Sequence, residues 1–457
     1  MTTPTIRKLF GTDGVRGEAG LFPLDANTVT IIGASLATRL GQRTGRAPLI
    51  VVGRDTRESG KWLEDALIEG ATEAGAECKS AGVITTPGVA FLARALDANA
   101  GVVLSASHNP YQDNGVKIFA PSGRKLDDET ERLIEADIFR EQLPRKRSQP
   151  HESSSRTLDQ SRELQTRYLD FLEDEIGTGL DLKEQTIVID TANGAASGLA
   201  PQLFAHLGAH VITINDQPDG RNINLNSGSL HIEGLQQRVV LTGATLGVAF
   251  DGDADRALFV DAAGRFVDGD ATLWVLANYL HSRGDLNHEV VVATVMSNIG
   301  LEIALRSRGL RLVRTDVGDK YVLEELLRTG ASLGGEQSGH IIFPRVSLAG
   351  DGMITTLALL RAMEDEKKPL HLLTEGFQRL PQILVNVKVR EKRPFEAIDQ
   401  IQNLAGRTQS LLGDKGRLLL RYSGTEPLAR IMIEGESQTE IEQYAKDLAT
   451  VIRESLA

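Results

Sequence analysis

The sequence predicts an α/β protein with three tandem, related α/β domains that contain mixed sheets, followed by a C-terminal α+β domain. Three observations lead to this class. The chain has 457 residues, which is too many for one hydrophobic core at ~150 residues per domain. A pattern of apolar strand, amphipathic helix, glycine and second strand occurs three times. The pattern then changes after about residue 370.

The repeated pattern is that of a βαβ unit, in which a glycine ends the helix before the chain returns to the sheet. Apolar strands flanked by amphipathic helices are typical of mixed or mainly parallel sheets covered on both faces. In the first copy, the strand 49–53 is followed by the helix 62–74, Gly75 and a strand from Ala76. In the second, the strand 186–190 is followed by the helix 199–207, Gly208 and the strand 210–214. In the third, the strand 290–294 is followed by the helix 299–308, Gly309 and the strand 311–314.

The last part of the chain predicts a small α+β domain. Residues 384–389 alternate between apolar and polar side chains, as a half-exposed strand does. A helix over 394–405, strands over 417–421 and 429–434, and a helix over 440–456 are expected to follow. We therefore expect four domains with these boundaries: 1–155, 156–255, 256–370 and 371–457.

The composition excludes several classes of function. The net charge of −12 argues against nonspecific binding of nucleic acid. The single cysteine, Cys78, can form neither an internal disulfide nor a thiolate metal cage. No apolar run approaches the ~18 residues of a membrane span, and no signal-peptide core follows the first residues. We therefore expect a cytoplasmic protein without nucleic-acid or membrane partners.

The stretch from Ser105 to Pro110 is the first candidate site. It places a hydroxyl, an imidazole and an amide in a loop directly after the apolar run 101–104. Loops that follow buried strands are where α/β proteins tend to place their chemistry. On its own, the stretch predicts only a nucleophile, Ser107, next to His108.

The second candidate site is a run of carboxylates. Asp251, Asp253 and Asp255 follow the apolar strand 246–250, with small residues between them. If the loop curls, the three carboxylates converge, and hard oxygen ligands of this kind suit Mg²⁺ or Ca²⁺. An EF-hand is excluded, because Arg256 occupies the loop position that requires glycine. A solvated acidic turn is the alternative interpretation.

Three further loops are rich in glycine and polar side chains. The loop Arg421–Pro427, with Arg430 just beyond it, offers backbone N–H groups and two guanidinium forks to a phosphate. The loop Gly334–His340 has groups able to bind sugar hydroxyls. The loop Phe10–Gly17 matches no nucleotide-binding motif, although its Arg16 could approach a phosphate. Each of these loops, taken alone, is also compatible with a plain turn.

Taken together, the five loops predict an enzyme that handles phosphate. A phosphoryl group on Ser107 would add roughly −1.5 to −2 charges to a site that already holds aspartates. Such a site requires a divalent cation and basic neighbours. A metal that bridges the phosphoserine and the aspartates would favour in-line transfer. The basic candidates are Arg16, Lys117, Arg256 and Lys320.

These motifs, in this order along essentially the whole chain, resemble those of the α-D-phosphohexomutase superfamily. The resemblance is closest to its bacterial phosphoglucosamine mutase branch, on the opening run 9–17, the run 218–224 and Gln337. None of the departures from the pattern removes a catalytic group. The departures are Tyr422 in place of a common proline, Lys320 in place of a common arginine and Ser227 in place of a frequent cysteine.

The resemblance implies four domains around one central cleft, each contributing a loop, and it implies that Ser107 is the phosphoserine. The ligands implied for Mg²⁺ are an oxygen on Ser107 and the carboxylates of Asp251, Asp253 and Asp255. The resemblance also implies proton transfer by Lys117 and His340, a catalytic contribution from Arg16, and a positioning role for His108. It implies that the substrate is bound by Arg256, Lys320, Glu336 and Ser338. The residues implied to bind the non-reacting phosphate are Arg421, Ser423, Gly424, Thr425 and Arg430.

The implied reaction is the reversible conversion of glucosamine 6-phosphate to glucosamine 1-phosphate, which feeds UDP-N-acetylglucosamine synthesis. Phosphorylated Ser107 would give its phosphoryl group to the sugar phosphate, and glucosamine 1,6-bisphosphate would be both intermediate and activator. The alternative within the superfamily is a phosphoglucomutase/phosphomannomutase. A phosphohydrolase and a non-catalytic sugar-phosphate sensor are the alternatives from other classes. The expected partner is a small-molecule sugar phosphate, and a homodimer is among the assemblies that the sequence allows.

Overall fold

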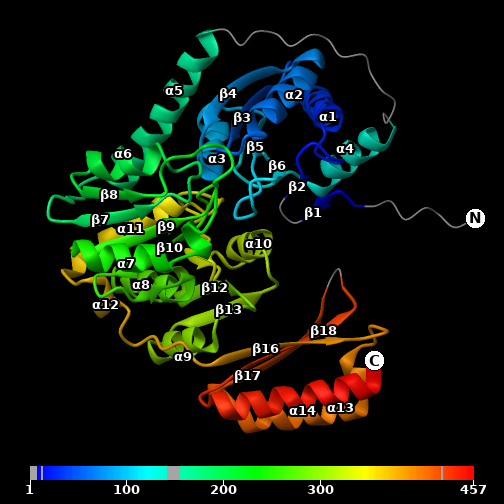
Figure 1. Ribbon diagram of the computed structural model, residues 1–457, viewed down its shortest axis with the longest axis vertical. Coiled ribbons are helices and arrows are strands. Elements are labelled where there is room, and N and C mark those ends of the chain that lie inside the picture. The colour runs from blue at the N-terminus through cyan, green and yellow to red at the C-terminus, as the bar shows by residue number, and fades with distance from the viewer. Residues whose placement is uncertain (1–7, 12–13, 141–154, 424–425, 457) are drawn as a thin grey trace, which may run out of the picture.

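The computed structural model describes residues 8–11, 14–140, 155–423 and 426–456, and it shows four units along the chain (Figure 1). Each of the first three contains a mixed sheet with helices packed against it. The fourth contains a three-stranded antiparallel sheet and two helices. The predicted fold class is confirmed. The segment 143–155, whose polar, proline- and serine-rich sequence predicts an exposed loop or linker, lies outside the described residues except for Ser155.

The first sheet places the end of β5 near its middle. Its strand order is β1-β2-β6-β5-β3-β4, and β5 runs parallel to β3 but antiparallel to β6. Every residue of β5 is buried, as its continuous apolar sequence predicts. The elements are β1 Phe10–Gly11, β2 Gly14–Glu18, α1 Ala26–Thr44, β3 Leu49–Arg54, α2 Gly60–Glu73, β4 Glu77–Val83, α3 Thr86–Ala95, β5 Ala100–Leu104, β6 Asp113–Phe119 and α4 Asp128–Arg140.

The second sheet, in the order β11-β10-β9-β7-β8, holds the acidic loop between two paired strands. Phe250 of β9 lies opposite Ala257 of β10, so residues 251–256 form a turn within the sheet. The sheet consequently extends to Val267, past the expected boundary at 255. The elements are α5 Ser155–Asp170, a π-helical turn Phe171–Ile176, β7 Thr186–Asp190, α6 Leu199–His206, β8 His210–Ile214, α7 Glu233–Thr242, β9 Leu246–Phe250, β10 Ala257–Asp261 and β11 Phe266–Val267.

The third sheet, in the order β13-β12-β14-β15, holds the loop Glu336–His340 between its last two strands. Its central strand, β12, is buried along its whole length. The elements of this unit are α8 Gly269–Ser282, β12 Val290–Thr294, α9 Ile299–Ser307, β13 Arg311–Thr315, α10 Asp319–Thr329, β14 Leu333–Gly335, β15 Ile341–Ile342, α11 Gly352–Glu366 and α12 Leu370–Leu373.

The fourth unit corrects one predicted helix. The helix expected over 394–405 begins only at Asp399 and continues to Leu412, whereas 395–397 form a 3₁₀ turn. Phe395 is buried and stacks on Tyr422 with ring centroids 4.3 Å apart, so this turn packs into the core instead of joining the helix. The elements are β16 Gln382–Lys388, α13 Asp399–Leu412, β17 Arg417–Tyr422, β18 Leu428–Glu434 and α14 Gln438–Leu456.

The first three units are held together by a shared hydrophobic core. One buried cluster includes Val89 of α3, Tyr168 of α5, Leu203 of α6 and Leu357 of α11. The fourth unit has a separate core beneath its own sheet, and its elements, coloured orange to red in Figure 1, lie beside the third unit, where Arg417 Nη2 donates to the Val295 carbonyl over 2.9 Å. The loops of the first three units are therefore fixed relative to one another by packing. Among the helices of the described residues, none has the length and apolarity needed to cross a membrane.

Candidate active site

Ser107 lies in the loop that leaves the buried strand β5, and its backbone is left-handed, with φ of 51°. This conformation is uncommon for a residue other than glycine and persists only where neighbouring groups hold it. The Ser107 N–H donates to Oγ of Ser105 over 2.9 Å. The Ser105 hydroxyl donates in turn to the Asp55 carboxylate over 2.7 Å. Ser105 therefore supports the loop, and the Ser107 hydroxyl faces the neighbouring domain.

A buried ion pair lies beneath this loop. The Arg57 Nε–H donates to the Asp55 carboxylate over 2.8 Å, and both side chains are inaccessible to solvent. The Arg57 Nη2 donates to the carbonyl oxygens of Ser107 and Asn109 over 3.0 and 2.8 Å. Neither residue was predicted from the sequence. The available signal was their position just after the apolar strand 49–53, at the edge of the sheet where β5 also ends.

The three predicted metal ligands converge. Asp251, Asp253 and Asp255 are buried, and their carboxylates each offer an oxygen within 4.8 Å of the others. The Ser107 hydroxyl donates to Asp251 Oδ2 over 2.6 Å, which joins the phosphoserine loop to the acidic loop. Lys117 Nζ, from β6, lies 2.7 Å from Asp253 Oδ2 and 3.4 Å from Asp255 Oδ2.

The carboxylates are electrostatically incomplete without a cation. Burial, followed by repulsion from Asp255 and Asp253, raises the pKa of Asp251 well above its usual range. Burial also acts to raise the pKa of Asp255, but Lys117 and His340 outweigh it and hold that pKa well below its usual range. The Oδ1 atoms of Asp253 and Asp255 are buried and accept no hydrogen bond within the described residues. An all-oxygen set with unsatisfied acceptors fits Mg²⁺.

His108 is neutral and points its Nδ1 atom toward Ser107. That nitrogen lies 3.3 Å from Ser107 Oγ and 3.4 Å from Arg256 Nη1. Burial, followed by the charges of Arg256 and Arg16, lowers the pKa of His108 to about 4. Because a guanidinium can only donate, Nδ1 accepts from Arg256. Arg16 lies on β2, paired with Gly115 of the strand that carries Lys117.

His340 is buried on the opposite side of Asp255, with Nδ1 3.7 Å from Asp255 Oδ1. Burial lowers the pKa of His340, but attraction to Asp255 outweighs it and raises the pKa to about 9. The Gly350 N–H, however, donates to His340 Nε2 over 3.2 Å, which requires that nitrogen to carry no proton. A cation on Asp255 would weaken the attraction, so we assign His340 as neutral, with Nδ1–H toward Asp255, when the metal site is filled.

The sugar-binding loop predicted in the third unit lies against the start of β10. The Ser338 hydroxyl donates to Glu336 Oε2 over 3.3 Å, and the Gly318 N–H donates to Glu336 Oε1 over 3.2 Å. The Ala257 N–H donates to the Gly339 carbonyl over 3.2 Å. The loop is therefore fixed beside Arg256, with a carboxylate and a hydroxyl positioned together.

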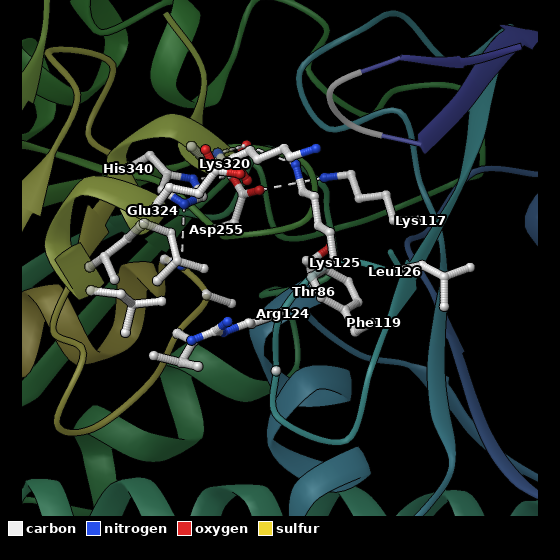
Figure 2. Close-up of a pocket in the computed structure, with 18 of the residues that line it drawn as sticks. Thr86, Lys117, Phe119, Arg124, Lys125, Leu126, Asp255, Lys320, Glu324 and His340 are labelled. Atoms are coloured by element: carbon white, nitrogen blue, oxygen red, sulfur yellow. Dashed lines mark hydrogen bonds and ion pairs between the residues drawn. The ribbon is translucent and has the colours of Figure 1, made fainter. Parts of the chain in front are cut away.

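A cavity of about 320 Å³ lies between the first and third units and reaches the acidic loop. In Figure 2, Lys117 and His340 approach Asp255 from opposite sides of this cavity. Lys320 stands at its wall, and its Nζ lies 2.9 Å from Asp128 Oδ1 of the first unit. In this structure Lys320 is thus turned toward an acidic residue and not toward Ser107.

The predicted phosphate loop belongs to the fourth unit. Arg421 and Arg430 lie opposite each other on β17 and β18, so two like charges face one another where an anion would stabilise them. Arg430 Nη2 lies 3.4 Å from Ser423 Oγ. Gly424 and Thr425 lie outside the described residues. No hydrogen bond joins Arg421, Ser423 or Arg430 to the described residues of the phosphoserine loop.

The family of the chain follows from its domain matches. Models described as phosphoglucomutase/phosphomannomutase match all four units: alpha/beta/alpha domain I at 7–145, domain II at 166–264, domain III at 268–380 and the C-terminal domain at 384–451. The chain belongs to the phosphoglucomutase/phosphomannomutase family. It is accordingly an isomerase of the phosphohexomutase kind, as the resemblance predicted.

Relatives and solved structures agree with this membership. The chain is 48% identical over 450 residues to a phosphoglucosamine mutase of Solibacter usitatus, covering 98% of this chain and 99% of that one. It is 44% identical over 463 residues to a phosphoglucosamine mutase of Koribacter versatilis, covering 100% of both. A phosphoglucomutase/phosphomannomutase family protein from Burkholderia thailandensis shares the fold, with a TM-score of 0.77, 23% identity, and coverage of 98% and 97%.

A more distant structure shows the same fold with ligands. It is the N-acetylphosphoglucosamine mutase of Aspergillus fumigatus in complex with GlcNAc-6P and magnesium. The match has a TM-score of 0.66 and 18% identity, and covers 98% of this chain and 96% of that one.

Proposed function

We propose that the protein is a phosphoglucosamine mutase that acts in the cytoplasm. It would interconvert glucosamine 6-phosphate and glucosamine 1-phosphate through phosphorylated Ser107 and glucosamine 1,6-bisphosphate. The observation that carries the proposal is the hydrogen bond from the Ser107 hydroxyl to Asp251, at the edge of a buried set of three carboxylates. The names of the full-length relatives support the amino sugar as substrate.

The donor set supports Mg²⁺ as the metal, held by Asp251, Asp253, Asp255 and a phosphoryl oxygen on Ser107. When bound, the metal would withdraw charge from the phosphoryl group and neutralise part of the carboxylate charge. Lys117 already neutralises Asp253 and Asp255 from the other side. Arg256 and Arg16 would stabilise the charge of the phosphoryl group, and burial together with Arg256 lowers the pKa of His108 and keeps it neutral.

The chemical step transfers a phosphoryl group between two oxygens. A hydroxyl oxygen of the sugar forms a bond to phosphorus while the bond from phosphorus to Ser107 Oγ breaks. The sugar hydroxyl loses its proton, and Lys117 and His340 are the two candidates to take it, since both line the cavity beside Asp255. Lys117 would take it as an uncharged amine, and His340 would take it at Nε2 in exchange for the bond from the Gly350 N–H. As it leaves, Ser107 Oγ takes up a proton and becomes a hydroxyl. In the second half-reaction this hydroxyl loses its proton while its oxygen attacks the other phosphoryl group of the bisphosphate, and the sugar oxygen that is released takes up a proton.

Binding of the sugar phosphate would draw on residues of the third and fourth units. Glu336 and Ser338 offer a carboxylate and a hydroxyl to sugar hydroxyls, and their mutual hydrogen bond places them together. The pair Arg421 and Arg430, with Ser423, would hold the phosphate that does not react; Gly424 and Thr425 are proposed for the same site from the sequence. Because the fourth unit has its own core, it can approach the phosphoserine loop as a body.

The decisive experiment combines phosphosite mapping with substrate comparison. We expect the purified enzyme to carry phosphate on Ser107, and we expect Ser107→Ala to bind sugar phosphate without turning it over. Activity of Ser107→Ala at the level of the unaltered enzyme would contradict the proposal. Values of kcat/KM for the 1-phosphates of glucosamine, glucose and mannose separate it from the phosphoglucomutase/phosphomannomutase alternative. Release of inorganic phosphate without isomerised sugar would instead indicate a hydrolase.

A further inference from the structure

The segment Gln217–Asn224, between β8 and α7, contacts the first unit directly below the phosphoserine loop, and the proposed chemistry assigns it no role. Its Gly220 carbonyl accepts the Glu58 N–H over 2.9 Å, and Arg221 Nε lies 2.7 Å from Glu58 Oε2. The segment itself is shaped by Asp219, whose Oδ1 accepts the backbone N–H of Arg221 over 2.8 Å. A loop of the second unit is thus attached to the first unit by hydrogen bonds.

Asn224 ends this segment and contacts Ser107. Its side-chain Nδ2 donates to the carbonyl oxygens of Ser107 and Asn109, each over 2.9 Å. Both hydrogens of the amide are therefore used on the phosphoserine loop. The Asn224 backbone is left-handed, with φ of 59°, and its N–H donates to the Ala192 carbonyl over 2.9 Å. The backbone conformation of Asn224 and its hydrogen bond to Ala192 consequently direct the side chain toward the phosphoserine loop.

The Ser107 carbonyl receives two donors from two different units. Arg57 Nη2 donates from the first unit over 3.0 Å, and Asn224 Nδ2 donates from the second unit. A carbonyl oxygen has two lone pairs, so these donors saturate it. Together they hold Ser107 in its left-handed conformation, which in turn aims Oγ at Asp251.

The acidic loop packs against the same two groups. A Cβ atom at Gly252 would lie 2.5 Å from the Ser107 carbonyl oxygen and 2.9 Å from Asn224 Nδ2. Only glycine permits this approach, which explains why a glycine stands between Asp251 and Asp253. Three groups therefore meet at one contact: the Ser107 carbonyl, the Asn224 amide and the Gly252 backbone. The distance from Ser107 Oγ to the metal ligands depends on this contact, because it joins the phosphoserine loop to the acidic loop.

We propose that Asn224 is a positioning residue for phosphoryl transfer, acting through the Ser107 backbone. The inference rests on the proposed role of Ser107 as phosphate carrier. Asn224 touches neither sugar nor phosphate in this assignment; its two hydrogen bonds fix the loop that carries the reacting oxygen. Loss of these bonds frees Ser107 to relax from its left-handed conformation and moves Oγ away from Asp251.

The test compares Asn224→Ala with Asn226→Ala. Asn226 lies in the same loop, is also left-handed with φ of 51°, is exposed, and makes no side-chain hydrogen bond within the described residues. Both variants introduce the same backbone strain, but only the first removes donors from the phosphoserine loop. The readout is the rate at which Ser107 is phosphorylated by glucose 1,6-bisphosphate in the presence of Mg²⁺, followed by intact mass. KM for the sugar phosphate and the thermal midpoint are measured alongside.

We expect Asn224→Ala to slow phosphorylation of Ser107 and to lower kcat by about 10- to 100-fold, the size of effect caused by a misplaced reacting group. KM is expected to stay unchanged, and the thermal midpoint to fall no further than in Asn226→Ala. Equal phosphorylation rates in the two variants would overturn the inference. The inference would also be overturned if the decrease in kcat equalled the decrease in the fraction of correctly folded protein.

A second variant keeps the test decisive if Asn224→Ala does not fold. Asn224→Gly removes the same donors while it relieves the left-handed strain, and the same slow phosphorylation is expected. Failure of the proposed function is a separate outcome: the unaltered enzyme would then take phosphate from glucose 1,6-bisphosphate but fail to isomerise glucosamine phosphates. The ratio of phosphorylation rates would still decide the role of Asn224.

Discussion

Lys117 Nζ lies 2.7 Å from Asp253 Oδ2, and both side chains are buried. The lysine therefore supplies positive charge to the acidic site, placed by β6 of the first unit against a loop of the second. An ion pair of this kind leaves an uncompensated charge when one partner is removed. The consequences for stability and for activity can be separated by measurement.

Lys117→Met should destabilise the metal-free enzyme and abolish most turnover. We expect the free energy of unfolding to fall by about 3–5 kcal/mol, because the buried carboxylates lose their cation. Addition of Mg²⁺ should restore part of that loss, because the metal supplies positive charge at the same place. Urea unfolding with and without Mg²⁺, together with kcat, measures both effects.

Lys125→Met is the matched control. Lys125 pairs with Asp319 over 2.7 Å at the boundary between the first and third units, and that pair is partly exposed. Its removal should cost about 1 kcal/mol or less, with no response to Mg²⁺ beyond that of the unaltered enzyme. Equal losses in the two variants would contradict the assignment of Lys117 to the acidic site.

Asp251→Asn should separate folding from metal binding. Burial and the neighbouring carboxylates raise the pKa of Asp251, so without metal an uncharged amide resembles the protonated carboxyl. We expect the thermal midpoint of the metal-free variant to equal or exceed that of the unaltered enzyme. The increase in midpoint on adding MgCl₂ should disappear, because a charged ligand is lost. An undiminished Mg²⁺ response would show that the metal binds elsewhere.

The parts of this site that could be predicted follow apolar strands in the sequence. Ser107 comes after β5 and the three aspartates come after β9, so the strand pattern and residue chemistry identified them. Asp55, Arg57 and Asn224 were missed, because their roles arise from contacts with residues 50 to 117 positions away. The fold was more predictable, since each strand, helix and glycine stop carries a local signal.

Two of the predicted site residues have surroundings that the sequence did not predict. His340 was expected in the site from its loop, yet the bond from Gly350 that fixes its tautomer depends on how 341–350 folds back. The pairing of Lys320 with Asp128 joins residues 192 positions apart. No local pattern encodes such a contact, because it depends on how the first and third units pack.

Asp270 should make stability depend on pH. Burial, followed by repulsion from Asp268, raises the pKa of Asp270 from 3.8 to about 7. The folded protein therefore binds more protons than the unfolded chain between these values, and its stability falls as pH rises through that window, by at most about 1.4 kcal/mol per pH unit. In Asp270→Asn the fall should be smaller, because the contribution of Asp270 is lost while that of Asp351, whose pKa burial raises to about 6, remains. Urea unfolding at pH 5 and pH 8 measures it, with the half-exposed Asp285→Asn as control.

Asp128→Asn should tighten binding of the sugar phosphate. Asp128 holds Lys320 over 2.9 Å, and this hydrogen bond, opposed by a smaller effect of burial, raises the pKa of Lys320. Removal of the carboxylate charge frees Lys320 for an anionic substrate without a large effect on folding, because the pair is exposed. We expect KM to fall about threefold while kcat stays constant, a change of roughly 0.6 kcal/mol in binding. Lys320→Ala should do the opposite and raise KM. If Asp128→Asn left KM unchanged while Lys320→Ala raised it, Lys320 would bind substrate without competition from Asp128.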